Sequence, residues 1–103
     1  MKLPPPAVEA LLDELWLDMD ALCRLAGVSE PWLHEHLDEG LLPVRPATPR
    51  DALRFGAADL RRVRRLAVLE RDFDAVPELA ALVADLEDEL AALRARLRRL
   101  GLD

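Results

Sequence analysis

Several residue types are missing from this chain or nearly so. It has no Asn, Gln, Ile or Tyr, and it has one lysine and one cysteine. The single cysteine, Cys23, excludes an internal disulfide, and we expect it to be a small buried hydrophobic residue. No run of about 18 apolar residues is present, so no membrane-spanning helix is expected. The N-terminus has no apolar run long enough for a signal peptide, which makes a cytoplasmic location the expectation.

The residue patterns that catalysis or metal binding requires are also scarce. His34 and His36 are two positions apart, so on a helix they point to different sides, and Cys23 lies one helix away. Ser29 is better placed as a helix cap, and Thr48 lies in a proline-rich loop with no evident base. No glycine-rich phosphate loop exists among the four glycines. We therefore expect no catalytic residue, no metal and no cofactor, and a protein that is not an enzyme.

Charge is distributed unevenly along the 103 residues, whose net charge is −6. Residues 1–52 hold ten acids and four bases, whereas residues 53–103 hold ten of each. An acidic surface favours basic partners and disfavours nucleic acid. The alternative is that the acids only keep a small protein soluble. A chain of this length has room for one modest core, and such domains commonly depend on a partner subunit.

The first firm structural feature is a predicted helix-turn-helix over residues 22–42. Asp18 can cap a helix over about 19–26, and Gly27 can end it in a left-handed conformation. Ser29 can cap a second helix over about 30–39, which Gly40 ends. The second helix would enter DNA in a DNA reader, yet it carries acids and no Lys or Arg. These acids are Glu30, Glu35, Asp38 and Glu39.

Other elements complete a mainly α fold. Residues 8–16 have helical spacing but are equally compatible with an extended lead-in. Residues 41–55 combine short apolar pieces with prolines, which predicts a two-stranded wing. A third helix is expected over 57–71, and Trp16 is expected in the core. The predicted organisation is a lead-in at 1–15, a winged helix-turn-helix domain at 16–72 and a long C-terminal helix within 73–103.

The final helix, from Pro77 to Leu100, carries one continuous leucine stripe and segregated charges. Acids occupy its first half and arginines its second half, which suits the helix dipole and makes two antiparallel copies complementary. We expect a homodimer through this stripe, the alternative being a single helix packed partly on its own domain. The stripe comprises Leu79, Leu82, Leu86, Leu90, Leu93, Leu97 and Leu100.

The order of these motifs resembles the MerR-like superfamily and, within it, the chaperone-modulator CbpM family. The resemblance covers about residues 16–100, and its individual motifs are short. They are Leu22-Cys23, Gly27-Val28-Ser29, Trp32, Glu39-Gly40-Leu41-Leu42, Arg54-Phe55, Asp59-Leu60-Arg61-Arg62 and the run from Leu93 to Leu97. DNA-binding relatives carry an Arg and two aromatic residues where this chain has His34, Glu35 and His36.

The resemblance implies binding to the J-domain of a CbpA/DnaJ-like co-chaperone, which restrains its action on the chaperone DnaK. J-domains present a basic helix to DnaK, and an acidic surface can compete for it. The sequence leaves two docking locations open, the second helix and the acidic start of the last helix, and Trp32 is either an apolar anchor or a core residue. The candidate docking residues are Glu30, Trp32, Glu35, Asp38, Glu39, Asp85, Glu87 and Asp88.

The less favoured hypothesis is a MerR-like transcription regulator that binds DNA. Four arginines within residues 61–65 wrap much of the third helix and can hold phosphates. More often such a run forms a solvated face paired with acids at helical spacing. The candidate phosphate contacts are Arg54, Arg61, Arg62 and Arg65.

Overall fold

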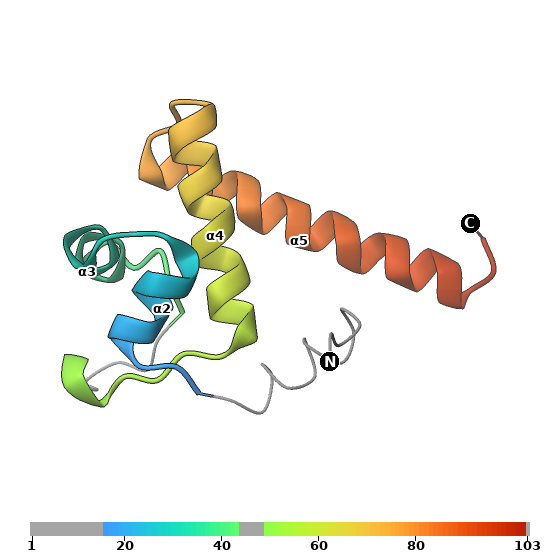
Figure 1. Ribbon diagram of the computed structural model, residues 1–103. Helices are drawn as coiled ribbons and strands as arrows, with labels where there is room; N and C mark the ends of the chain where they lie inside the picture. The colour runs from blue at the N-terminus through green and yellow to red at the C-terminus, as the bar shows by residue number, and fades with distance from the viewer. Residues whose placement is uncertain (1–15, 44–48, 103) are drawn as a thin grey trace, which may run out of the picture.

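The computed structural model describes residues 16–43 and 49–102, and it is mainly helical over them. The elements are α2 (Met19–Ala26), α3 (Glu30–Asp38), a short 3-10 helix η1 (Arg50–Ala52), α4 (Ala57–Asp72) and α5 (Pro77–Arg99). Helices α2 and α3 lie on one side of α4, and α5 crosses behind α4 and continues as a long arm beyond the domain (Figure 1). The predicted mainly α class is confirmed.

The helix-turn-helix forms at the predicted residues. The Asp18 carboxylate accepts a hydrogen bond from the Ala21 amide at 2.8 Å and begins α2. Gly27 ends α2 with φ of 71°, a left-handed conformation that a side chain would strain. The Ser29 hydroxyl accepts from the Trp32 amide at 3.2 Å and begins α3. These local interactions fix the angle between the two helices before any long-range packing is considered.

The core lies between α4 and the helix-turn-helix. Leu22 from α2 and Leu33 from α3 are fully buried against Val63 and Leu66 of α4. Full burial of one such side chain contributes roughly 1.5–3 kcal/mol. On α2, Ala26 is half-buried and Leu25 is exposed, while on α3 His36 and Leu37 are both buried.

Two predictions about the flanks of the domain are corrected. Phe55 forms an antiparallel bridge with Leu17, with N–H to O distances of 2.7 and 2.8 Å, and residues 41–43 form no strand. Phe55 is fully buried and takes its backbone partner from the chain before α2, so no described residue supplies the expected wing pairing. Trp16 is 67% exposed and is not a core residue. Residues 8–15 and the expected wing tip at 44–48 lie outside the described residues.

Helix α5 packs on α4 through alanines. Ala80, Ala81 and Ala84 are buried, and their small side chains let the two helices approach closely. The leucine stripe lies on the other side of α5, and its members are between 45% and 67% exposed. Within residues 16–43 and 49–102, no helix is both long and apolar enough to cross a membrane.

Candidate functional site

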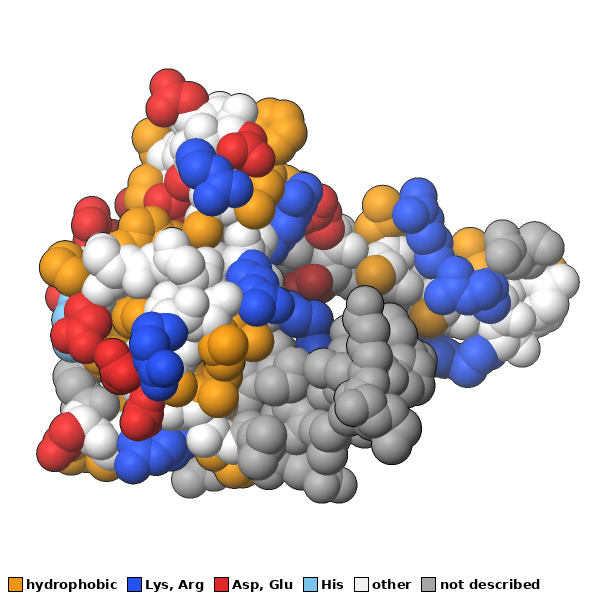
Figure 2. Space-filling view, viewed as in Figure 1, with side chains coloured by type: hydrophobic (Ala, Val, Ile, Leu, Met, Phe, Trp, Pro, Cys, Tyr) orange, Lys and Arg blue, Asp and Glu red, His pale blue; other side chains and the backbone are white. Residues whose placement is uncertain are grey.

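Acidic side chains gather on the outward face of α3. Glu30, Glu35 and Glu39 are exposed there, as is Asp38. Figure 2 shows acidic groups on the side of the molecule where α2 and α3 lie, with basic groups among them, and basic groups along the outer half of α5. Helix α3 contains no Lys or Arg, so its exposed face repels phosphate and attracts a basic surface. We refer to Glu30, Glu35 and Glu39 as the α3 acidic face.

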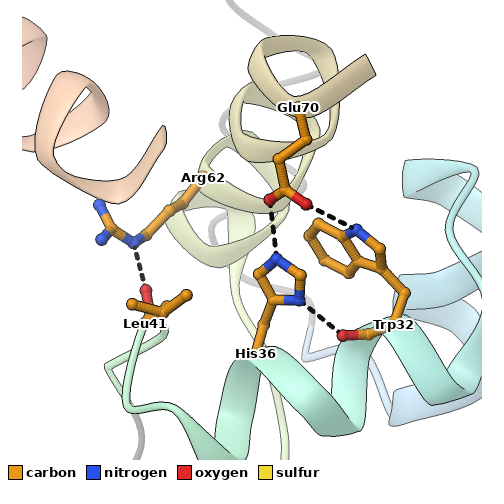
Figure 3. A network of polar contacts seen from close by, with 5 residues as sticks. All are labelled: Trp32, His36, Leu41, Arg62 and Glu70. Atoms are coloured by element: carbon orange, nitrogen blue, oxygen red, sulfur yellow. Dashed lines mark hydrogen bonds and ion pairs between the residues drawn. The ribbon is translucent and has the colours of Figure 1, made fainter. Parts of the chain in front are cut away.

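The inward side of α3 is fixed by a polar network as well as by leucines. The His36 ring lies between two acceptors, with Nε2 at 2.7 Å from Glu70 Oε2 and Nδ1 at 2.7 Å from the Trp32 carbonyl (Figure 3). The Trp32 indole N–H donates to the other Glu70 oxygen at 3.3 Å. The Trp32 and His36 rings stack with centroids 3.6 Å apart. Glu70 of α4 therefore binds two side chains of α3 at once.

The partners of His36 are a backbone carbonyl and a carboxylate group. Both accept hydrogen bonds, so each ring nitrogen that carries a proton donates to its partner. The His36 side chain is 1% exposed, and its contact with Glu70 is an ion pair when the ring is protonated. Removal of one member of such a pair strongly destabilises the folded state, because the other member remains buried without a partner. The network therefore holds α3 in one orientation on α4.

Trp32 contributes to both of the roles that the sequence left open. Its ring is half-buried and packs against the core, as a structural residue does. It also lines an open groove of about 370 Å³, together with Val28, Ser29, Ala67 and Glu70. Gly27 and the basic Arg71 also line this groove, which adjoins the first turn of α3.

Two arginines of α4, Arg62 and Arg65, form hydrogen bonds and ion pairs within the molecule. Arg62 donates from Nε to the Leu41 carbonyl at 2.9 Å and from a terminal nitrogen to Asp85 at 2.8 Å (Figure 3 shows the first bond). Arg65 forms a two-pronged ion pair with Glu87, with distances of 2.8 and 2.6 Å. The sequence predicted a solvated face paired with acids at helical spacing; these arginines instead pair with acids of α5, and the Arg62 side chain is largely buried.

The remaining arginines in that region also bind backbone. Arg64 donates to the Leu25 carbonyl from two nitrogens, at 3.3 and 2.9 Å, and links α4 to the end of α2. Arg54 donates to the Asp51 and Leu53 carbonyls beside η1. Arg61 is exposed. Three of the four proposed phosphate contacts, Arg54, Arg62 and Arg65, thus already form hydrogen bonds or ion pairs within the chain.

The acidic start of α5 differs electrostatically from the α3 acidic face. Asp85 and Glu87 each face an arginine of α4, and the hydrogen bond from Arg65 lowers the pKa of Glu87 below its ordinary 4.5. Asp88 and Glu89 are exposed on the same helix. Because two of these acids are partly neutralised by α4, the α3 acidic face is the stronger attractor of a basic partner.

The sequence did not identify the buried pairing of His36 with Glu70. Helical spacing alone leaves open whether His36 or Leu37 faces inward on α3, and whether Leu69 or Glu70 faces inward on α4. The signal was the coincidence of a basic and an acidic residue at inward positions of two helices that pack together. The ion pairs of Arg62 and Arg65 likewise required knowing which face of α5 meets α4.

In comparisons with known proteins, the chain matches no family model, no curated protein and no solved structure.

Proposed function

We propose that the chain is a chaperone modulator that binds the J-domain of a CbpA/DnaJ-like co-chaperone and restrains its action on DnaK. The observation that carries this proposal is the α3 acidic face, which occupies the helix that would read DNA and contains no Lys or Arg. A basic J-domain helix has charge complementary to it. The mechanism is steric and electrostatic occlusion without chemistry, so no residue acts as a catalyst.

Two features favour α3 over α5 as the docking helix. The acids of α5 share their charge with Arg62 and Arg65, whereas α3 has no Lys or Arg of its own. The groove beside Trp32 also adds apolar area next to the α3 acidic face, and interface anchors are often aromatic. The docking set is therefore Glu30, Trp32, Glu35 and Glu39.

The proposed assembly is a homodimer through the leucine stripe of α5. The stripe is exposed along the whole helix, and an apolar surface of this extent favours a partner. Acids dominate the first half of α5 and arginines the second, so an antiparallel second copy brings opposite charges together. The two docking faces then belong to separate subunits.

The test is titration of the purified chain with a purified J-domain by calorimetry at two salt concentrations. We expect binding at low salt that weakens at high salt, because the interface is electrostatic. Glu35→Lys should weaken binding by roughly tenfold or more, since it places a like charge opposite the basic helix. Asp88→Lys tests the α5 alternative. Asp51→Lys carries the same charge change outside both helices and should alter binding by less than about twofold.

The outcomes separate the hypotheses. Absence of binding at low salt would refute the modulator proposal. A larger loss with Asp88→Lys than with Glu35→Lys would move the docking site to α5. The DNA-binding alternative would require salt-sensitive binding to duplex DNA that Arg61→Ala weakens, with no affinity for the J-domain.

A further inference from the structure

The start of α5 borders an apolar groove, whereas its end carries exposed leucines. We propose that, in the homodimer put forward above and resting on it, the C-terminal tip of α5 from one copy occupies an apolar groove at the α4–α5 junction of the other. The groove is defined by Leu69, Phe73, Val76, Leu79 and Val83, and the tip by Leu97, Leu100 and Leu102.

The groove is open and apolar. It has a volume of about 460 Å³ and lies where α4 ends and α5 begins. Phe73 is 70% exposed at its edge, and Val76 and Leu79 are also exposed. Arg65 and Asp74 line it as well and give it a charged rim. An apolar surface with a polar rim is typical of an interaction site rather than of a free surface.

The tip is built by the way α5 ends. Gly101 adopts φ of 71°, and the Leu102 amide donates to the Leu97 carbonyl at 2.9 Å. In this type of helix end, the residue after the glycine packs against the residue whose carbonyl it binds. Leu102 is thereby turned back toward Leu97 and is 69% exposed, as Leu100 is 67% exposed. The end of the arm thus carries leucines that are mostly exposed within the described part of the chain.

The spacing of the stripe brings the tip to the groove. When a second α5 is reversed about residue 88, Leu79 lies opposite Leu97 and Leu86 opposite Leu90, while Leu82 and Leu93 are offset from each other by one residue. The same register places Val76, in the groove, opposite Leu100, in the tip. This register therefore pairs four of the six leucines from 79 to 97 directly and the other two within one residue.

The charges agree with the same register. Glu78, beside the groove, is level with Arg98 near the tip, and Asp85, which also pairs with Arg62 of its own chain, lies three residues from the level of Arg94 in the second copy. A parallel pairing would instead place Glu78 beside Glu78 and the arginines beside each other, which is unfavourable. Charge and apolar pattern therefore select one occupant, a second copy in antiparallel orientation.

Disulfide trapping between two singly substituted chains tests this placement. One chain carries Phe73→Cys and the other Leu102→Cys, both with Cys23→Ala to remove the native thiol. We expect a covalent heterodimer on a non-reducing gel after mixing and mild oxidation, because the two side chains meet within disulfide range. Each chain alone should give little crosslink, since the two copies of either position lie at opposite ends of the dimer. Ala91→Cys, exposed in the middle of α5, replaces Leu102→Cys as the control partner.

Light scattering on the same chains distinguishes a failure of the dimer from a failure of the groove placement. A monomeric mass would refute the dimer and this inference together. A dimeric mass without a crosslink between positions 73 and 102 would refute the groove placement and leave the dimer intact. Crosslinking of the Leu102→Cys chain with itself would indicate a parallel pair and overturn the inference.

A second measurement does not depend on oxidation. Leu100→Asp combined with Leu102→Asp should raise the dimer dissociation constant by about tenfold or more, because both leucines leave an apolar contact. Ala91→Asp should change it by less than about twofold, because this residue lies off the stripe. All three positions are exposed, so the domain should fold normally, which circular dichroism checks. Equal effects of the two variants on the dissociation constant would contradict the proposed position of the tip in the groove.

Discussion

At the scale of single residues, burial and charge separate side chains that look alike in the sequence. Cys23 is 6% exposed, and burial raises the pKa of its thiol above the ordinary 9.0, with the carboxylates of Glu30 and Asp20 adding to the effect. His34 and His36 are both histidines of α3, yet only His36 is fully buried. Differences in burial therefore decide which of these side chains are accessible to solvent and which pack in the core.

Cys23 should make stability fall at alkaline pH. The folded thiol keeps its proton above pH 9.0, whereas the unfolded thiol loses it near that value, so the folded state loses stability as pH rises beyond 9.0. We expect Cys23→Ala to lower the free energy of unfolding by on the order of 1 kcal/mol at pH 8. Between pH 8 and pH 10, the variant should lose less stability than the wild type.

Urea denaturation at the two pH values measures this difference. The chain has no tyrosine and one lysine, so few other side chains titrate in the same range. The rate of reaction of the wild-type thiol with a disulfide reagent gives a second readout and should be slow in the folded state. Equal pH dependence of wild type and Cys23→Ala would contradict the prediction.

At the scale of elements, the contact between α3 and α4 combines leucines with the Trp32–His36–Glu70 network. Glu70→Ala removes the acceptor of two half-buried or buried donors. We expect it to lower the free energy of unfolding by about 1–3 kcal/mol, the usual cost of an unsatisfied buried polar group. Glu89→Ala, an exposed acid on α5, should change stability by less than about 0.5 kcal/mol.

Chemical denaturation and tryptophan fluorescence measure the effect. Trp16→Phe provides a background in which Trp32 alone reports the contact, and Trp16 is exposed enough for this change to be mild. A double-mutant cycle with His36→Ala isolates the coupling between His36 and Glu70. If Glu70→Ala and Glu89→Ala had the same effect, the network would not stabilise the contact.

Local chemistry made the helices predictable, and long-range pairing made the rest unpredictable. Asp18, Gly27 and Ser29 act on neighbours within four residues, so the helix-turn-helix could be placed from the sequence. The bridge between Leu17 and Phe55 joins segments 38 positions apart, and no local pattern identifies that partner. The acids of α3 could be identified as exposed from helical spacing, whereas the partners of Arg62 and Arg65 depended on how α5 crosses α4.

At the scale of the whole molecule, the leucine stripe of α5 is about half-exposed within the described residues. The radius of gyration is 15.2 Å and the arm extends well past α4 (Figure 1). Leucines at this spacing in water favour association. If the proposed dimer forms, its dissociation constant is the property we expect to respond most to substitutions in the stripe.

Leu86→Arg combined with Leu93→Arg should give a monomer. Both positions are about half-exposed, so the change acts on the proposed interface and leaves the core intact. Light scattering should report the mass of one chain for the variant and of two for the wild type. Asp88→Asn with Ala92→Ser alters the same stretch of α5 away from the leucines and should remain dimeric. An unchanged mass of the double-arginine variant would refute the dimer.

The alanine contact between α4 and α5 has a consequence for geometry. Small side chains bring the two helix axes close and leave little room for rocking, so the arm is held at a fixed angle to its domain. A helix of 23 residues is about 35 Å long. In an antiparallel pair it acts as a rigid spacer that holds two copies of the α3 acidic face apart at one set distance. Such a dimer would bind most tightly to partners that present two basic surfaces at a matching separation, because the second contact forms at high effective concentration.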